Sequence, residues 1–142
     1  MEIKTYSQNQ EPEWLHNIVH TGTIDHISNP YPKMGETVVI TLEVPLKAQP
    51  EQVVLRSIPN GEQQLSPMKA TETRGVMQLW QGELLINEPR VPYRFAIQAE
   101  GHIWWINALG FSQQSPLGLF DFKLLANSPE IPWLNRSVFY QI

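Results

Sequence analysis

Tryptophan residues are the clearest candidates for ligand binding in this chain. Trp104 and Trp105 are adjacent in one apolar run, and Trp80 lies in an earlier one. A flat indole can stack on the apolar C–H face of a sugar ring at little cost in side-chain entropy. Trp80, Trp104 and Trp105 are therefore the candidate carbohydrate-binding residues.

Their orientation depends on the strands that hold them, because neighbouring residues on a β-strand point to opposite faces. One indole of the pair Trp104-Trp105 is expected to enter the core while the other stays on the outer surface. The outward indole could contact sugar, or it could pack under a loop or against another domain, and the sequence leaves both interpretations open. Trp80 shares its face with Gln78 and Gly82, which is typical of a half-exposed side chain.

Histidines suggest a second chemistry, because His16, His20 and His26 are separated by even numbers of residues and lie beside Asp25. In one continuous strand they would line a single face, which is the least that a metal site requires. Thr21-Gly22-Thr23 interrupts any such strand. We therefore expect exposed histidines near a turn, with no metal ion and no cofactor.

Carboxylates give no sign of a hydrolytic centre. Retaining glycosidases need two carboxyl groups about 5 to 5.5 Å apart, and the acidic residues here fall mostly in turns or on solvated strand faces. Asp121 alone lies in an apolar run, between Phe120 and Phe122, where alternation points it outward. Gly-rich phosphate loops, nucleophile elbows and zinc-binding helix motifs are missing from the sequence. We expect no catalytic residue in this chain.

Composition limits the remaining possibilities. The 142 residues are 42% hydrophobic with a formal net charge of −4, as in a soluble globular domain that does not bind nucleic acid. The length is well below the roughly 250 residues of a (β/α)₈ barrel. With no cysteine, disulfides and thiolate sites are excluded. The polar start resembles no secretory signal and no apolar run is long enough to cross a membrane, so a cytoplasmic location is expected.

Twelve prolines and eight glycines punctuate short apolar runs along the chain. Residues 37–44 alternate cleanly between apolar and polar, and Asn60-Gly61 and Glu100-Gly101 are each expected to turn a hairpin. The pattern predicts an all-β fold, an immunoglobulin-like antiparallel β-sandwich of about seven or eight strands. Its strands are expected at 37–44, 52–58, 63–69, 76–86, 91–99, 102–107 and 120–125, with a weaker one within 16–27.

Three regions are expected along the chain. Residues 1–13 form a loose N-terminal arm, 14–126 form the sandwich, and 127–142 form a linker and the start of another strand. Val138 to Ile142 is rich in β-branched and aromatic residues and follows two proline-containing dipeptides. Such a strand without a partner would be an exposed edge, so its partners are expected in a domain absent from this chain.

Several short motifs carry a resemblance to a known family, strongest from Tyr93 onward. They are Val53-Val54-Leu55-Arg56, Met68, Trp80-Gln81-Gly82, Tyr93-Arg94-Phe95, Trp104-Trp105, Gly110-Phe111-Ser112 and the tail Trp133 to Ile142. Together they resemble the N-terminal β-sandwich, classed with family 34 carbohydrate-binding modules, of alpha-amylase family enzymes (glycoside hydrolase family 13). The likeness covers about residues 36–142 and is greatest to maltodextrin glucosidases, cyclomaltodextrinases and neopullulanases.

The resemblance implies an accessory domain of an enzyme that hydrolyses α-1,4 bonds in maltodextrins or cyclodextrins. Such a domain would bind α-glucan oligosaccharides weakly, rest on its own catalytic barrel, or help to form a homodimer. Residues 127–142 would then be the linker and truncated first strand of the barrel, and the isolated chain would be inactive. The alternative is a stand-alone immunoglobulin-like protein-interaction module, in which Val138 to Ile142 would pair within the sandwich. A small independent enzyme has only scattered histidines and carboxylates in its favour.

Overall fold

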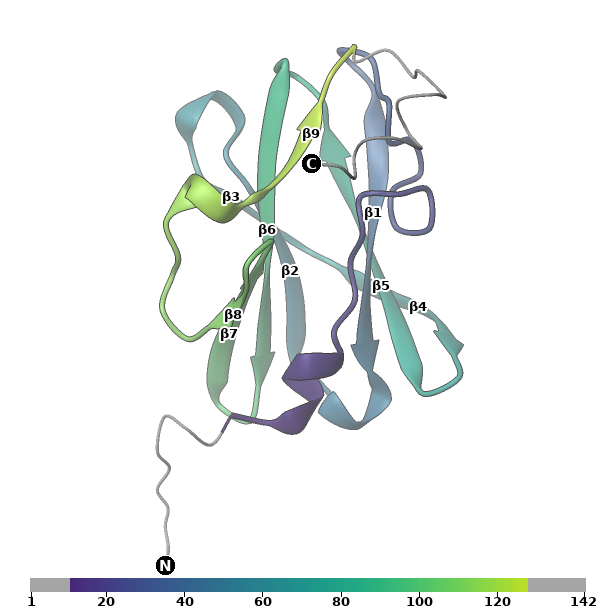
Figure 1. Ribbon diagram of the computed structural model, residues 1–142, viewed down its shortest axis with the longest axis vertical. Helices are drawn as coiled ribbons and strands as arrows, with labels where there is room; N and C mark the ends of the chain where they lie inside the picture. The colour runs from purple at the N-terminus through teal and green to yellow at the C-terminus, as the bar shows by residue number, and fades with distance from the viewer. Residues whose placement is uncertain (1–10, 128–142) are drawn as a thin grey trace, which may run out of the picture.

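The computed structural model describes residues 11–127, which form an all-β sandwich with only short 3₁₀ helices beside the strands (Figure 1). The strands are β1 (Thr37–Pro45), β2 (Gln52–Ser57), β3 (Gln64–Pro67), β4 (Lys69–Arg74), β5 (Met77–Leu85), β6 (Arg90–Ala99), β7 (His102–Asn107), β8 (Gly110–Ser112) and β9 (Phe122–Leu125). The 3₁₀ helices are η1 (Glu13–Asn17), η2 (Leu46–Ala48), η3 (Pro59–Gly61) and η4 (Gly118–Phe120). The predicted fold class is confirmed.

The strands form two antiparallel sheets. The three-stranded sheet, sheet A, has the order β1-β5-β4. The six-stranded sheet, sheet B, has the order β3-β2-β6-β7-β8, and β9 also pairs with β6. The chain passes from sheet B to sheet A between β3 and β4, at Met68, which is buried and donates its amide hydrogen to the Val53 carbonyl. The predicted strand at 63–69 therefore corresponds to β3, and β4, which begins at Lys69, is a further strand that the sequence did not predict.

Alternation along the central strands builds the core between the sheets. On β1, Val38, Ile40, Leu42 and Val44 are at most 1% exposed, as the sequence pattern predicts. β6 contributes a second buried row, whose members are Tyr93, Phe95 and Ile97. Full burial of each large apolar side chain stabilises the fold by roughly 1.5 to 3 kcal/mol.

Both predicted turns are confirmed by their backbone angles. Asn60 and Gly61 have φ of 57° and 84°, and Glu100 and Gly101 have φ of 54° and 80°. These left-handed conformations suit Asn and Gly. Glu100 and Gly101 fill a tight two-residue hairpin, because Ala99 pairs with His102, whereas Asn60 and Gly61 lie in the longer 58–63 loop between Ser57 and Gln64. The first turn connects β2 to β3, and the second connects β6 to β7.

The weaker strand expected within 16–27 does not form. The chain instead makes η1 and then a strap, residues 18–28, along the free edge of β1 (Figure 1). Two isolated bridges, Val19 with Glu43 and Ile27 with Ile40, join strap and strand. The turn at 21–25 interrupts regular pairing, because His26 and Ile27 both donate their amide hydrogens to the Thr23 carbonyl. The strap thus covers an edge that would otherwise be unpaired.

Strand β6 is shared by two partners along one of its edges. Its first residues, Arg90 to Tyr93, pair with β9, whereas Phe95 to Ala99 pair with β7. Arg94 lies at the fork between them, and the chain from 108 to 121 connects the two partners.

Strand β9 ends at Leu125, near the end of the predicted sandwich. Most of the predicted arm at 1–13 lies outside the described residues. So does the predicted strand Val138 to Ile142, together with nearly all of the linker before it.

Candidate functional site

The two adjacent tryptophans point to opposite faces of sheet B. Trp104 pairs with the fully buried Ile97 and is itself 7% exposed. Trp105 pairs with Ala96 on the outer face of the sheet and is half-buried. Of the two indoles, only that of Trp105 therefore lies on the side of the sheet away from the core.

Around Trp105 the strands align three rows of side chains on the outer face of sheet B. The central row is apolar and consists of Val54 on β2, Ala96 on β6 and Trp105 on β7. In a sheet, side chains directly opposite each other across neighbouring strands lie about 5 Å apart. We call the central row, Val54, Ala96 and Trp105, together with the half-exposed Ile103, the Trp105 face.

Polar side chains border the Trp105 face on both sides. Gln52 and Gln98 are register partners one row away and are both exposed. Arg56 and Arg94 are register partners in the row on the other side. The Arg94 guanidinium carbon lies 5.5 Å from the centre of the Trp105 ring, in a cation–π contact. The arrangement offers an apolar centre, in which Trp105 is half-buried and Ala96 is buried, with the exposed amides of Gln52 and Gln98 along one margin.

Arg94 is held by a buried carboxylate. Its Nε lies 3.1 Å from Oδ1 of Asp121, and Nη1 of Arg56 lies 3.3 Å from Oδ2 of the same carboxylate. The first pair is an ion contact without hydrogen-bond alignment. Asp121 faces outward, as alternation indicates, yet it is only 4% exposed because the two arginines surround it. Burial raises the pKa of the Asp121 carboxyl, and Arg94, Arg56 and Lys123 act against this shift.

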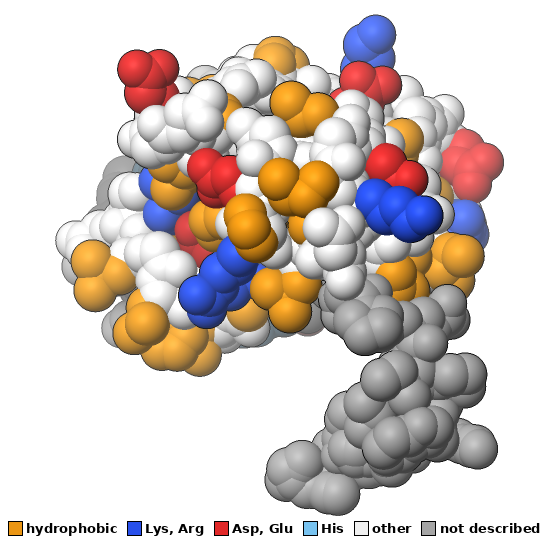
Figure 2. All heavy atoms as spheres, turned by 90° about the horizontal axis from the view of Figure 1, so that it is seen from above, with side chains coloured by type: hydrophobic (Ala, Val, Ile, Leu, Met, Phe, Trp, Pro, Cys, Tyr) orange, Lys and Arg blue, Asp and Glu red, His pale blue; other side chains and the backbone are white. Residues whose placement is uncertain are grey.

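The same arginine anchors the loop that borders the Trp105 face. Arg94 Nη1 donates a hydrogen bond of 2.7 Å to the Pro116 carbonyl and one of 3.4 Å to Ser115. This loop, residues 113–120, and the β7–β8 turn expose several apolar side chains. They are Leu109, Leu117, Leu119 and Phe120, which are 44 to 80% exposed. Figure 2 shows how single charged side chains separate hydrophobic ones across the end of the molecule that it views.

The third candidate tryptophan lies elsewhere. Trp80 on β5 packs against the core and shares its face with Gly82, where an added Cβ would meet Met68 and Leu55 at 3.1 and 3.4 Å. Its indole Nε1 is buried and has no hydrogen-bond partner among the described residues. Trp80, Trp104 and Trp105 thus do not form one surface, and Trp105 has the most suitable position for a ligand.

The prediction of exposed histidines near a turn is wrong for two of the three. His26 is 4% exposed and His20 is half-buried, whereas His16 remains exposed. The reason is that the strap packs along β1, so alternate side chains of the strap turn toward the sheets. His102, in contrast, is exposed at the start of β7.

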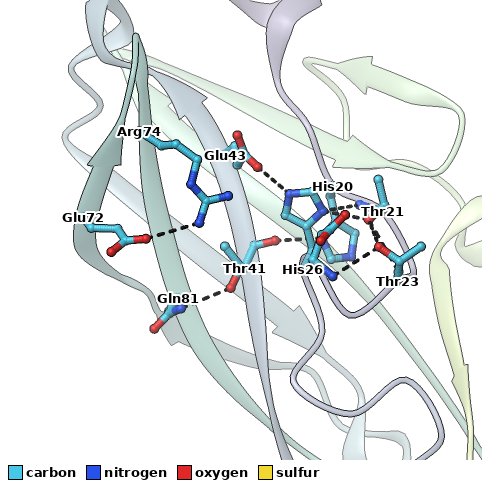
Figure 3. A network of polar contacts seen from close by, with 10 residues as sticks. His20, Thr21, Thr23, His26, Thr41, Glu43, Glu72, Arg74 and Gln81 are labelled. Atoms are coloured by element: carbon cyan, nitrogen blue, oxygen red, sulfur yellow. Dashed lines mark hydrogen bonds and ion pairs between the residues drawn. The ribbon is translucent and has the colours of Figure 1, made fainter.

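His20 and His26 belong to the polar network of Figure 3. His26 Nε2 lies 2.7 Å from Oε2 of Glu43 on β1, and His20 Nδ1 lies 2.8 Å from the Thr41 carbonyl. Gln81 on β5 donates to the Thr41 hydroxyl. Over residues 11–127, no three His, Asp or Glu side chains converge in a way that could hold a metal ion. The network therefore fastens the strap to sheet A.

Within the described part of the chain, no helix is long and apolar enough to cross a membrane.

Comparison with known proteins locates the same architecture inside larger chains. No family model and no curated protein matches the sequence. Among solved structures, a cyclomaltodextrinase superposes with a TM-score of 0.69 at 18% identity, over 82% of this chain and 20% of its own. A maltogenic amylase from S. marinus superposes with a TM-score of 0.61 at 16% identity, over 86% of this chain and 16% of its own. The chain spans a fifth or less of these two proteins, and at such identity it shares with them a β-sandwich fold.

Proposed function

We propose that this chain is an accessory β-sandwich domain of an α-glucan hydrolase of the alpha-amylase family, of the family 34 carbohydrate-binding type. Its role is weak binding of maltodextrin or cyclodextrin. The Trp105 face carries the contact, and the catalytic residues belong to a barrel outside this chain. The structural neighbours support the fold, and the family motifs in the sequence support the α-glucan class.

The observation that carries the proposal is the row Val54-Ala96-Trp105 with Gln52 and Gln98 beside it. A glucose ring has apolar C–H faces and a rim of hydroxyl groups. The indole can stack on such a face, while the amides can donate to and accept from the hydroxyls. Because a sugar stacked on the outer face of a sheet keeps much of its surface in water, we expect millimolar affinity.

The wider biological setting follows from the same proposal. In the full enzyme the sandwich would rest on its own catalytic barrel or help to form a homodimer, in the cytoplasm. The isolated chain would bind glucan without hydrolysing it. Trp80 and Trp104 would then have structural roles, since both pack inward.

Affinity electrophoresis through gels that contain soluble amylopectin tests this role. We expect the wild-type chain to be retarded, and Trp105→Ala to weaken binding roughly tenfold, or about 1.4 kcal/mol. Leu85→Ala is the matched control, because Leu85 is an exposed apolar residue on sheet A. Equal retardation of all three proteins would show that Trp105 does not contact the glucan. Migration of the wild-type chain that is unaffected by amylopectin would reject glucan binding.

A protein-interaction module is the second candidate. It is favoured by the apolar side chains exposed around the 113–120 loop, since surfaces of this kind are typical of contacts with another protein or domain. This candidate predicts no response to amylopectin.

A further inference from the structure

The strap is attached to β1 by backbone and side-chain contacts. Val19 and Glu43 exchange two amide–carbonyl hydrogen bonds of 3.0 Å, and the Thr41 amide donates to the His26 carbonyl at 2.8 Å. Near the end of the strap, the Ser28 amide donates to the Val39 carbonyl. These bonds lie at the edge of the sandwich, where local opening costs less than opening of the core.

His20 is the strap side chain that joins both sheets. Its Nδ1 lies 2.8 Å from the Thr41 carbonyl on β1, and its Nε2 lies 2.8 Å from the Tyr93 hydroxyl on β6. A carbonyl can only accept, so Nδ1 carries the hydrogen, and Nε2 of the neutral ring accepts from the tyrosine. Burial raises the pKa of Tyr93, so the phenol keeps its proton. The neutral ring thus matches both of its hydrogen-bond partners, the Thr41 carbonyl and the Tyr93 hydroxyl.

The surroundings of the His20 ring are aromatic. Its centroid lies 4.8 Å from that of Phe122, 5.0 Å from Phe95 and 5.6 Å from Tyr93. A positive charge there would lose hydration without gaining a carboxylate partner. The pKa of His20 is lowered to about 4, chiefly by burial; the hydrogen bond to Thr41 acts against this shift, and the nearby His26 adds to it.

The other titratable groups that face His20 do not compensate for such a charge. On the strap, His26 lies 5.7 Å away, ring to ring, and on β1 Glu43 is engaged by His26 Nε2. The Thr21 amide donates to His26 Nδ1, which leaves Nε2–H to donate to Glu43. Strand β6 contributes the uncharged Tyr93, and the β9 residue in ring contact with His20 is Phe122.

We propose that the strap is a pH-sensitive clasp, closed while His20 is neutral and opened from the β1 edge when His20 takes up a proton. A cavity of about 180 Å³, lined by His20, Leu15, Phe111 and Phe122 among others, lies beside the ring on the side of the β7–β8 turn. Water that enters this cavity can bring the proton. Protonation would place a hydrogen on Nε2, pointing toward Tyr93, so that the Tyr93 hydroxyl would lose its acceptor.

The direction of the pH dependence follows from linkage. A free histidine binds its proton near pH 6.5, whereas the closed clasp delays this to about pH 4. The contribution of His20 to closure is therefore complete above pH 6.5 and is lost as the pH falls toward 4. Between pH 7 and pH 4.5, the equilibrium constant for opening should rise by roughly 50-fold.

Hydrogen exchange of the 142-residue chain, followed by NMR and corrected for intrinsic rates, tests the clasp. The readout compares the protection factors of the strap-linked amides of Val19, Thr41 and Glu43 with that of Met68. The Met68 amide donates to the Val53 carbonyl on β2 and does not contact the strap through this bond. We expect protection of the first three to fall roughly 50-fold relative to Met68 from pH 7 to pH 4.5. In His20→Gln, which cannot titrate, the ratio should change less than about threefold.

Two results would overturn the clasp. One is parallel loss of protection at Met68 and at the strap in wild type, which is global acid unfolding. The other is an unchanged pH response in His20→Gln. If that variant does not fold, the wild-type ring resonances decide the matter. Titration of His20 together with strap opening supports the clasp, and titration without opening rejects it.

Discussion

Replacing Asp121 with asparagine is expected to lower the free energy of unfolding by about 3 to 5 kcal/mol. The carboxylate is buried between Arg94 and Arg56, and the side chain of Arg94 is also only 3% exposed. Asparagine fills the same volume without the charge, so two guanidinium groups are left close together with no anion between them. Breaking a buried ion pair by removing one partner is costly for this reason.

Urea unfolding, followed by tryptophan fluorescence, measures this effect. The matched control is Glu72→Gln, which removes the carboxylate of the Glu72–Arg74 pair on β4. Both side chains of that pair are at least 60% exposed, so the loss there should be below about 1 kcal/mol. Equal losses in the two variants would mean that the Asp121 cluster is solvated in solution.

Substitution of the two adjacent tryptophans should give very different losses of stability. Trp104→Ala is expected to cost about 3 to 5 kcal/mol, because it removes an indole packed in the core against Phe111. Trp105→Ala removes an indole from the outer face and should cost about 1 kcal/mol or less, mainly through its contact with Arg94.

The midpoints of thermal and urea unfolding of both variants test this contrast. Each variant serves as the control for the other, since they differ only in which face of β7 loses an indole. Comparable losses, or a larger loss in Trp105→Ala, would contradict the register of β7 against β6. The small loss expected for Trp105→Ala also makes it a suitable variant for binding experiments.

Local patterns were sufficient to predict most of the strands. A strand or a turn can be predicted when residues adjacent in sequence determine it. This is so for the alternation on β1 and for the turns at Asn60-Gly61 and Glu100-Gly101, and all three predictions are confirmed. Two strands were missed. Strand β4 is exposed along its whole length, so it has no apolar face to detect, and β8 has only three residues.

The strap could not be predicted, because its conformation depends on contacts distant in sequence. His20 meets Thr41 and Tyr93, which lie 21 and 73 residues away. Within residues 16–27, the polar turn gives the appearance of a solvated segment. Only the pairing with β1 explains why His20 and His26 turn inward.

The candidate site was predicted in part. Alternation correctly indicated that one indole of the pair faces outward, but the sequence could not say which one. It also gave no sign that Val54, Ala96 and Gln98 lie beside Trp105, because that depends on the register of three strands. The arginine pair at 56 and 94 was missed for the same reason.

The family resemblance is supported at the level of the fold. A cyclomaltodextrinase, one of the enzymes to which the motifs point, is among the structural neighbours. The assignment to family 34 carbohydrate-binding modules and the roles of the three tryptophans stay predictions.

Amide NMR mapping of the 142-residue chain with maltohexaose and β-cyclodextrin tests glucan binding by this sandwich most directly. We predict saturable shifts at millimolar sugar that centre on Val54, Ala96, Ile103 and the indole of Trp105. Saturable shifts that centre on another surface would contradict the assignment of the Trp105 face. An unchanged spectrum at millimolar concentrations of both sugars would contradict glucan binding by this domain altogether.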